Sequence, residues 1–283
     1  MLEDSEAGGC RLHFGRLGLW AEASAVVIVE LGSTAMPDFY FRNPVDGYEL
    51  VLIPAGRAIF GEGDERFEAE LPDYYLGIYC VTNAEYAAFL NTAQPSEADL
   101  LRWVLLDWDC HVVRRGDGYG VDDLHRYGDH PVVQVGWYGA EAYCEWAGLR
   151  LPTELEWEKG ARGVDGRAYP WGEEWDAGKC RHYGNRGRET TCLVREYPGG
   201  VSPWGLYNMS GNVWEWCADW YEEEAYKRYA QGDLAPPASA HYMVVRGGSW
   251  TNDDPSDFRC VCRASPVPAT RIVTSGFRCA RGL

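Results

Sequence analysis

The sequence of 283 residues has very little lysine and no long apolar run. Lysine occurs only at positions 159, 179 and 227, and 26 basic against 43 acidic residues give a formal net charge of −17. Nucleic acids and anionic membrane surfaces attract lysine and arginine, so this balance argues against either as the main partner. No apolar run reaches the length that spans a bilayer. We therefore expect no nucleic-acid partner and no membrane insertion.

An export signal and a disulfide scaffold are also missing. The N-terminus carries Glu3, Asp4 and Glu6, whereas a secretory signal begins with positive charge. With neither a signal peptide nor a spanning segment, we expect a cytoplasmic or virus-associated protein by default. Ten cysteines are few for a disulfide scaffold in a chain of this length, and no Cys-x-x-Cys pair indicates a zinc ribbon.

Tryptophan and tyrosine, by contrast, are abundant, with 13 and 18 copies against 8 phenylalanines. Rings with one polar end pack well beside polar groups and loops. Beyond residue 169 proline and glycine turns dominate, and strands do not alternate with helices along the chain. This pattern argues against a doubly wound parallel sheet and favours an α+β fold.

Local patterns predict where the regular elements lie. The predicted strands cover residues 48–56 and 74–81, and the predicted helices cover residues 83–92, 138–147 and 153–163. Thr82 with Glu85, and Thr153 with Glu156, have the spacing of capping boxes. The stretch 93–131 is polar and irregular, which indicates an inserted loop or hairpin. Residues 1–40 show no clear periodicity, so we expect an N-terminal extension followed by one domain over 41–283.

Several long motifs follow one another in the second half of the chain. They are Arg-Leu-Pro-Thr-Glu-Leu-Glu-Trp-Glu at 150–158, Tyr-Pro-Trp-Gly at 169–172, Gly-Leu-Tyr-Asn-Met-Ser-Gly-Asn-Val-Trp-Glu-Trp at 205–216, Arg-Gly-Gly-Ser-Trp at 246–250 and Gly-Phe-Arg-Cys at 276–279. In this order they resemble the formylglycine-generating-enzyme (sulfatase-modifying factor) domain over about residues 48–281. The resemblance implies a C-type-lectin-like α+β fold with two helices, short antiparallel strands and long loops. It also implies that Cys144 pairs with Cys279.

One function that the resemblance implies is a copper-dependent oxidase that converts a substrate cysteine to formylglycine. That chemistry needs two cysteines soon after the Arg-Gly-Gly-Ser element. The matching positions here are Asn252 and Asp257. Neither oxygen-bearing side chain supplies the soft thiolate that Cu(I) prefers. We therefore expect a protein that is not an enzyme, with the oxidase kept as the alternative.

The second function that the resemblance implies is that of the variable protein of a diversity-generating retroelement. In such systems template adenines are randomised, so that an AAC codon becomes any NNC codon and never encodes Lys, Glu, Gln, Met or Trp. None of these five residue types occurs from Thr251 to Ser275. We therefore predict a hypervariable segment over about 251–275, called the C-terminal segment below. An unspecified lectin-like binding domain remains a further alternative.

Within this segment a framework alternates with positions expected to vary. The framework consists of Phe258, Arg259, Cys260, Arg263, Pro268 and Arg271, continuing into Gly276-Phe277-Arg278. The varied positions, predicted to form a ligand-binding surface, are Thr251, Asn252, Asp253, Asp254, Ser256, Asp257, Cys262, Ala264, Ser265, Pro266, Val267, Ala269, Thr270, Ile272, Val273 and Thr274. The expected partner is an unidentified protein or surface ligand. Because the set holds three aspartates and lacks Tyr and Trp, it favours weak binding or a basic patch.

The resemblance also implies a structural calcium site. Calcium prefers hard oxygen ligands in a turn that can wrap around it. By position, the ligands are Asn208, the backbone carbonyls of Gly211 and Val213, and the carboxylate of Glu215. The alternative is a tight turn in which Asn208 caps backbone groups.

Overall fold

The computed structural model describes residues 39–283, so nearly all of the predicted N-terminal extension lies outside the described residues. The helices and strands of the described residues are β1 (Tyr40–Arg42), β2 (Glu49–Ile53), β3 (Gly56–Phe60), β4 (Phe67–Leu71), β5 (Tyr74–Gly77), α1 (Asn83–Ala93), α2 (Glu97–Trp103), β6 (Val112–Arg115), β7 (Gly118–Val121), α3 (Leu124–Tyr127), α4 (Trp137–Trp146), α5 (Glu154–Arg162), β8 (Trp214–Trp220), α6 (Ala225–Tyr229), β9 (Met243–Arg246), β10 (Arg263–Ala264), β11 (Ser275–Gly276) and β12 (Ala280–Gly282). This is a mixed α+β fold of short elements, as the sequence predicts.

The strands form two four-stranded sheets and two hairpins. The first sheet has the order β1-β2-β5-β12, with every neighbour antiparallel, so the last strand of the chain pairs with an early one. The second sheet has the order β10-β9-β8-β11, in which only β11 runs parallel to its neighbour β8. The hairpins are β3–β4 and β6–β7.

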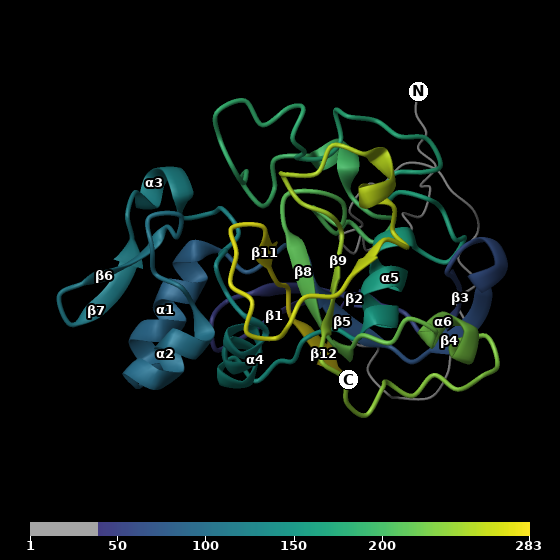
Figure 1. Ribbon diagram of the computed structural model, residues 1–283, viewed down its shortest axis with the longest axis horizontal. Helices are drawn as coiled ribbons and strands as arrows, with labels where there is room; N and C mark the ends of the chain where they lie inside the picture. The colour runs from purple at the N-terminus through teal and green to yellow at the C-terminus, as the bar shows by residue number, and fades with distance from the viewer. Residues whose placement is uncertain (1–38) are drawn as a thin grey trace, which may run out of the picture. The chain divides into compact units, whose positions relative to one another are not determined.

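Helices and hairpins lie on both sides of the second sheet (Figure 1). In that view α1, α2, α3 and the β6–β7 hairpin gather to the left of β8 and β9, and β3, β4 and α6 lie to the right. Helix α1 packs on β6 and β7, α2 packs on α4, and α6 contacts β4. No helix in residues 39–283 is long and apolar enough to cross a membrane.

Three predicted helices are confirmed, and the capping boxes explain two of them. Thr82 accepts a hydrogen bond from the backbone N–H of Glu85, and Thr153 accepts one from that of Glu156, so both helices begin where the sequence places them. The stretch 93–131 differs from its prediction, because it contains α2 and α3 besides a hairpin. The described residues therefore contain more helices than the two that the resemblance implies or the three that local patterns predict. These short elements have weak local patterns and are stabilised by packing, α2 on α4, the hairpin on α1, and α3 on β7.

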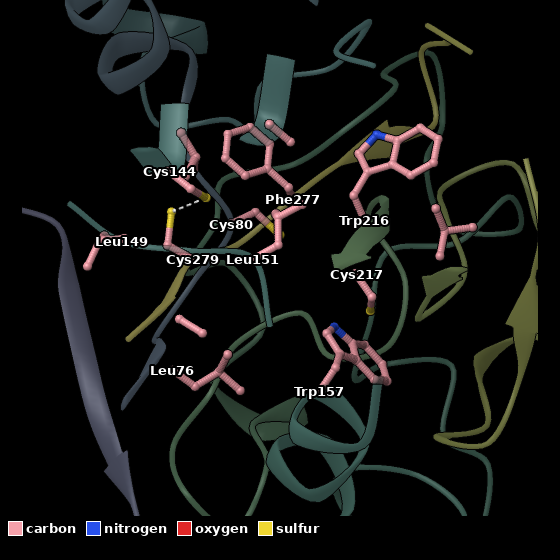
Figure 2. Packing of buried hydrophobic residues seen from close by; sticks show 14 of the residues in the cluster. Leu76, Cys80, Cys144, Leu149, Leu151, Trp157, Trp216, Cys217, Phe277 and Cys279 are labelled. Atoms are coloured by element: carbon pink, nitrogen blue, oxygen red, sulfur yellow. Dashed lines mark hydrogen bonds between the residues drawn. The ribbon is translucent and has the colours of Figure 1, made fainter. Parts of the chain in front are cut away.

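The main core is rich in aromatic rings and thiols (Figure 2). Trp157, Trp216 and Phe277 are fully buried in it. The sulfur atoms of Cys144 and Cys279 lie 3.5 Å apart, in hydrogen-bond contact. A disulfide requires about 2.05 Å. The structure thus places the expected pair side by side, as two buried thiols.

Buried charges explain the motif at 150–158. Glu154, Glu158 and Arg162 are spaced four residues apart on α5 and are all buried. Arg246, at the end of β9, is fully buried and forms ion pairs with Glu154 at 2.6 Å and Glu158 at 2.8 Å. Arg162 pairs with Glu158 at 2.8 Å. These pairs join α5 to the strand that leads into the C-terminal segment.

The two glycines of the Arg-Gly-Gly-Ser element turn the chain out of β9. Gly247 and Gly248 have φ values of +100° and +75°, in the region that side chains disfavour. A Cβ atom on Gly247 would lie 3.1 Å from the ring of Trp157. Glycine is therefore required where the buried strand ends and the C-terminal segment begins.

Candidate functional site

The C-terminal segment lies at the surface and is anchored by buried residues between and after its varied positions. None of the varied positions is buried, whereas Phe258, Cys260 and Phe277 are fully buried. Val267 and Ile272 are 46% and 43% exposed although both are aliphatic. The fully buried anchors thus interrupt a run of exposed and half-exposed positions, and the framework residues Arg259, Arg263, Pro268 and Arg271 are themselves half-exposed.

Backbone groups hold much of this segment in place. Carbonyl oxygens of four varied or framework positions accept hydrogen bonds from N–H groups elsewhere in the chain: Met243 to Pro266 at 2.9 Å, Trp137 to Pro268 at 2.9 Å, Gln134 to Ile272 at 3.1 Å and Trp214 to Thr274 at 2.8 Å. The indole of Trp250 donates to the carbonyl of Val273 at 3.0 Å. A backbone carbonyl is present whatever the side chain is. These contacts therefore remain when the side chains at the varied positions change.

Two framework arginines also hold the segment. Arg263 forms a forked pair with Glu154, with its Nε and Nη2 atoms 2.6 Å and 2.8 Å from the two carboxylate oxygens. It donates further to the backbone carbonyl of Glu222 at 3.1 Å. Arg271 donates to the backbone carbonyl of Leu101 in α2. Both arginines thus fix backbone that lies between varied positions.

Three varied positions at the start of the segment make side-chain hydrogen bonds within a turn, which the sequence did not predict. The amide oxygen of Asn252 accepts from the backbone N–H and the hydroxyl of Ser249, at 3.0 Å and 2.8 Å. Its Nδ2 atom donates to Asp257 at 2.8 Å. The hydroxyls of Thr251 and Ser249 lie 2.9 Å apart. Side-chain bonds over such short spacings are typical of turns. Asn252 and Asp257 thus help to shape the surface as well as contributing to it.

A copper-thiolate site does not fit these residues. Asn252 and Asp257 occupy the expected thiolate positions and bond to each other. Cys260 is fully buried, and burial raises its pKa to about 12, so it remains a protonated thiol. Burial also raises the pKa of Cys262. Within residues 39–283 no three His, Cys, Asp or Glu side chains are arranged to hold a metal ion.

The expected calcium site does not fit either. Glu215 is fully buried, and both of its carboxylate oxygens lie 2.6 Å from the guanidinium of Arg278. The indole of Trp157 donates to the same carboxylate at 2.8 Å. The side-chain oxygen of Asn208 accepts from Asn212 at 3.3 Å. Glu215 is thus the partner of a buried arginine, and the turn through Gly211 and Val213 lacks the anionic ligand that the resemblance assigns to it.

A small cavity adjoins the C-terminal segment. It measures about 190 Å³ and is lined by Val273 together with Trp108, Asp109, His111, Tyr127, Val133, Arg188, Glu189 and Thr190. The rings of His111 and Tyr127 stack at 3.6 Å, and Trp108 is 89% exposed. Sequence reasoning missed these residues, although an exposed tryptophan in the polar insertion was the available signal. They supply the aromatic groups that the varied positions lack.

Comparisons with known proteins identify the family. The model of the sulfatase-modifying factor enzyme 1-like domain matches residues 38–283. The serine/threonine-protein kinase pkn1 of Chlamydia caviae is 38% identical over 244 residues, which are 83% of this chain and 38% of that protein. The chain thus spans well under half of that relative. The formylglycine-generating enzyme of Streptomyces coelicolor is 34% identical over 280 residues, covering 81% of this chain and 88% of the enzyme.

A solved structure confirms the fold. The structure of Treponema denticola variable protein 1 is similar with a TM-score of 0.64 and 23% identity, over 86% of this chain and 98% of that one. The predicted resemblance to the formylglycine-generating-enzyme domain is confirmed by the family match, and the resemblance to a variable protein is confirmed at the level of the fold.

The expectation that the chain is not an enzyme is contradicted. The enzyme from Streptomyces coelicolor aligns along most of both chains, so the family to which the motifs point includes enzymes. The expectation rested on two positions, Asn252 and Asp257. Those residues argue against one copper site, and they do not exclude catalysis by the chain.

Proposed function

The chain belongs to the sulfatase-modifying factor enzyme 1-like domain family, and from this premise we propose that it binds a protein or surface ligand through the varied positions of its C-terminal segment. The observation that carries the proposal is the way in which the segment is anchored. Its backbone is held by carbonyl contacts and by framework arginines, while the varied side chains stay exposed or half-exposed. Such a surface can change its side chains and keep its shape.

The finer part of the proposal is that a retroelement diversifies this surface. Support comes from the residue types, because every varied position carries a residue that an NNC codon encodes. Among the varied positions, those from Ala264 to Thr274 can be exchanged with the least loss of side-chain hydrogen bonds. Within the described residues, the hydroxyls of Ser265, Thr270 and Thr274 take no part in a hydrogen bond.

The charges on the surface indicate the chemistry of the partner. Asp253 and Asp254 are exposed, whereas Arg263 is committed to Glu154. The chain as a whole carries a net charge of −17. A partner with a basic patch therefore suits this copy of the surface better than an acidic one. Trp108, at the neighbouring cavity, offers the aromatic contact that interfaces commonly use.

Site-specific crosslinking tests ligand binding. A photoreactive amino acid replaces Ile272 or Val267 in the C-terminal segment, and Val164, which is 50% exposed near β3, serves as the control position. Cell extract from the native host is the probe. The proposal expects one defined partner to be captured from the segment and not from the control. Equal capture from both positions would contradict it.

Genomic sequencing tests diversification. The proposal expects a reverse-transcriptase gene near the coding sequence, together with a near-copy of its 3′ end that differs at adenines. Independent isolates should then differ at the varied positions and agree at framework positions such as Arg263 and Phe277. Differences spread evenly over the domain would contradict this part of the proposal and leave ligand binding to be judged by crosslinking.

The oxidase remains the weaker candidate. Asn252 and Asp257 provide no thiolate, so no residue pair at those positions supports copper chemistry. Because the family includes enzymes, the mass of any captured partner should also be compared with that of its uncaptured form. A change at one residue of the partner would identify a reaction at the same surface.

A further inference from the structure

A well-formed cavity in the described residues lies away from the C-terminal segment. It measures about 410 Å³, which is within the range of small-ligand sites. It opens between the start of α1, the start of β2 and the loop 193–196. Its lining residues are Glu49, Tyr79, Thr82, Ala84, Glu85, Asp129, Leu193, Val194, Arg195 and Glu196. The segment 251–275 contributes none of them.

The cavity carries an excess of negative charge. Four carboxylates line it against one guanidinium, which leaves three negative charges unbalanced when all four are ionised. The guanidinium of Arg195 forms an ion pair with Glu49 and lies 4.6 Å from the centre of the Tyr79 ring. The charge of Arg195 is thus paired with that of Glu49. The carboxylates of Glu85, Asp129 and Glu196 have no ion-pair partner among residues 39–283.

Glu85 is a half-buried acid in the first turn of α1. One of its oxygens accepts from the backbone N–H and from the hydroxyl of Thr82, each at 2.8 Å. Burial raises the pKa of Glu85 to about 7, the bonds from Thr82 oppose that rise, and the nearby carboxylates of Asp46 and Asp129 add to it. A pKa raised in this way is typical of a carboxyl group that has no positive charge beside it.

We propose that this cavity binds a small organic cation through a protonated amine that pairs with Glu85. The remaining wall suits such a ligand, because Ala84, Leu193 and Val194 offer apolar surface beside the Tyr79 ring. A bare metal ion suits it less, since no three acidic, His or Cys side chains of the described residues converge as a metal site requires. The net charge of −17 attracts cations over a longer range.

The pairing gives binding a definite dependence on pH. The amine is protonated throughout the range from pH 6 to 8, whereas the carboxyl of Glu85 is half-ionised near pH 7. Binding therefore strengthens as pH rises through 7, because less work is needed to ionise Glu85. Below pH 7 the affinity falls by up to about tenfold per pH unit, the limit for one coupled proton. The carboxylates of Asp46 and Asp129 raise the pKa of Glu85 and so act in the same direction. Glu49 and Glu196 also line the cavity, and Arg195 is paired with Glu49.

Calorimetry with butylamine as the probe and butan-1-ol as its neutral counterpart tests the proposal. The expected result is that butylamine binds, that its affinity is higher at pH 8 than at pH 6, and that the alcohol does not compete. Absence of butylamine binding at both pH values, or equal binding of the alcohol, would overturn the proposal. Binding of calcium with no binding of amine would overturn it as well.

Variants locate the site. Glu85→Gln keeps an acceptor for the capping box of α1 and should weaken butylamine binding about tenfold and remove its pH dependence. Asp129→Asn should weaken it by a smaller factor, and its side chain makes no hydrogen bond within the described residues, so folding is preserved. Glu223→Gln, exposed and outside the cavity, is the matched control and should bind as the unaltered chain does. Unchanged affinity in both cavity variants would contradict the assignment.

Discussion

Asn252 donates a hydrogen bond to Asp257 over 2.8 Å, at the two positions where the family resemblance places a pair of thiolates. The two side chains are therefore in contact through nitrogen and oxygen and supply no thiolate. Ser249 completes the arrangement by donating twice to the Asn252 side chain. In this chain these hydrogen bonds hold the turn at the start of the C-terminal segment.

Restoring sulfur at the two positions should create a copper site. The 2.8 Å contact joins δ atoms, and the sulfur atoms of two cysteines would take the places of the two Cγ atoms, within reach of one Cu(I) ion after small rotations. Asn252→Cys with Asp257→Cys should therefore raise Cu(I) affinity at least about tenfold, measured by competition with a chromogenic Cu(I) chelator. Both proteins should carry Cys262→Ser, which removes the half-buried thiol nearby. Equally tight binding before and after the change would contradict this view of the pair.

Removing the charge of Glu215 should destabilise the core severely. Glu215→Gln leaves the fully buried guanidinium of Arg278 without its anion, and breaking such a pair costs about 3–5 kcal/mol. Denaturant unfolding measures the loss. The control is Glu97→Gln, whose pair with Arg114 is exposed, so this change is expected to leave the free energy of unfolding almost unaltered. Similar losses of stability in both variants would contradict the expectation that the buried pair contributes more than the exposed pair.

Calcium should not act through the turn from Asn208 to Glu215. Arg278 contacts both carboxylate oxygens, so a calcium ion would have to displace a forked, buried pair. We expect that neither added calcium nor a chelator changes the melting temperature. A calcium-dependent rise that disappears in Asn208→Ala would show instead that the turn rearranges to bind the ion.

Two buried groups should give opposite dependences of stability on pH. Burial lowers the pKa of His130 from 6.5 to about 4, so its stabilising contribution is present above pH 6.5 and is lost as pH falls toward 4. Burial, with Glu154 nearby, raises the pKa of Asp219 from 3.8 to about 7, so its contribution is present below 3.8 and is lost as pH rises toward 7.

The corresponding variants separate the two contributions. Between pH 6.5 and 4.5, stability relative to His130→Gln should fall with decreasing pH, whereas stability relative to Asp219→Asn should rise. Each slope is at most about 1.4 kcal/mol per pH unit. Urea unfolding at several pH values measures both differences. Slopes of the same sign would contradict the assigned protonation states.

Local signals in the sequence predicted the local parts of the fold. The capping boxes at Thr82 and Thr153 marked two helix starts, because a cap is formed by residues three apart. The short helices α2 and α3 were missed, since α2 depends on packing against α4 and α3 on packing against β7 of the hairpin.

Long-range pairs could not be predicted from one sequence. Arg278 and Glu215 are separated by 63 positions, and only the folded chain shows that they neutralise each other. For that reason the sequence did not reveal that Glu215, predicted to bind calcium, is instead paired with Arg278. The exposure of the C-terminal segment was foreseen because its residue types follow no helical or strand period. The bonds from Ser249 to Asn252 were missed, because turn contacts of side chains leave little trace in composition.

The central claim is that a fixed framework supports exchangeable side chains, and denaturant unfolding of two sets of variants tests it most directly. The first set replaces Asp253, Val267, Ala269 and Ile272 together by small polar residues; all four are exposed, and Asn252 and Asp257 are left intact. The second set is the single change Phe277→Ala, which removes a fully buried ring that contacts Tyr86 and Tyr143.

The account predicts that the four exposed replacements cost at most about 0.5 kcal/mol each, whereas Phe277→Ala costs about 3–5 kcal/mol. Circular dichroism of both proteins before unfolding confirms that each begins from the native fold. A loss from the exposed set that equals or exceeds the loss from Phe277→Ala would show that the C-terminal segment is an ordinary packed element, and the claim of an exchangeable binding surface would be wrong.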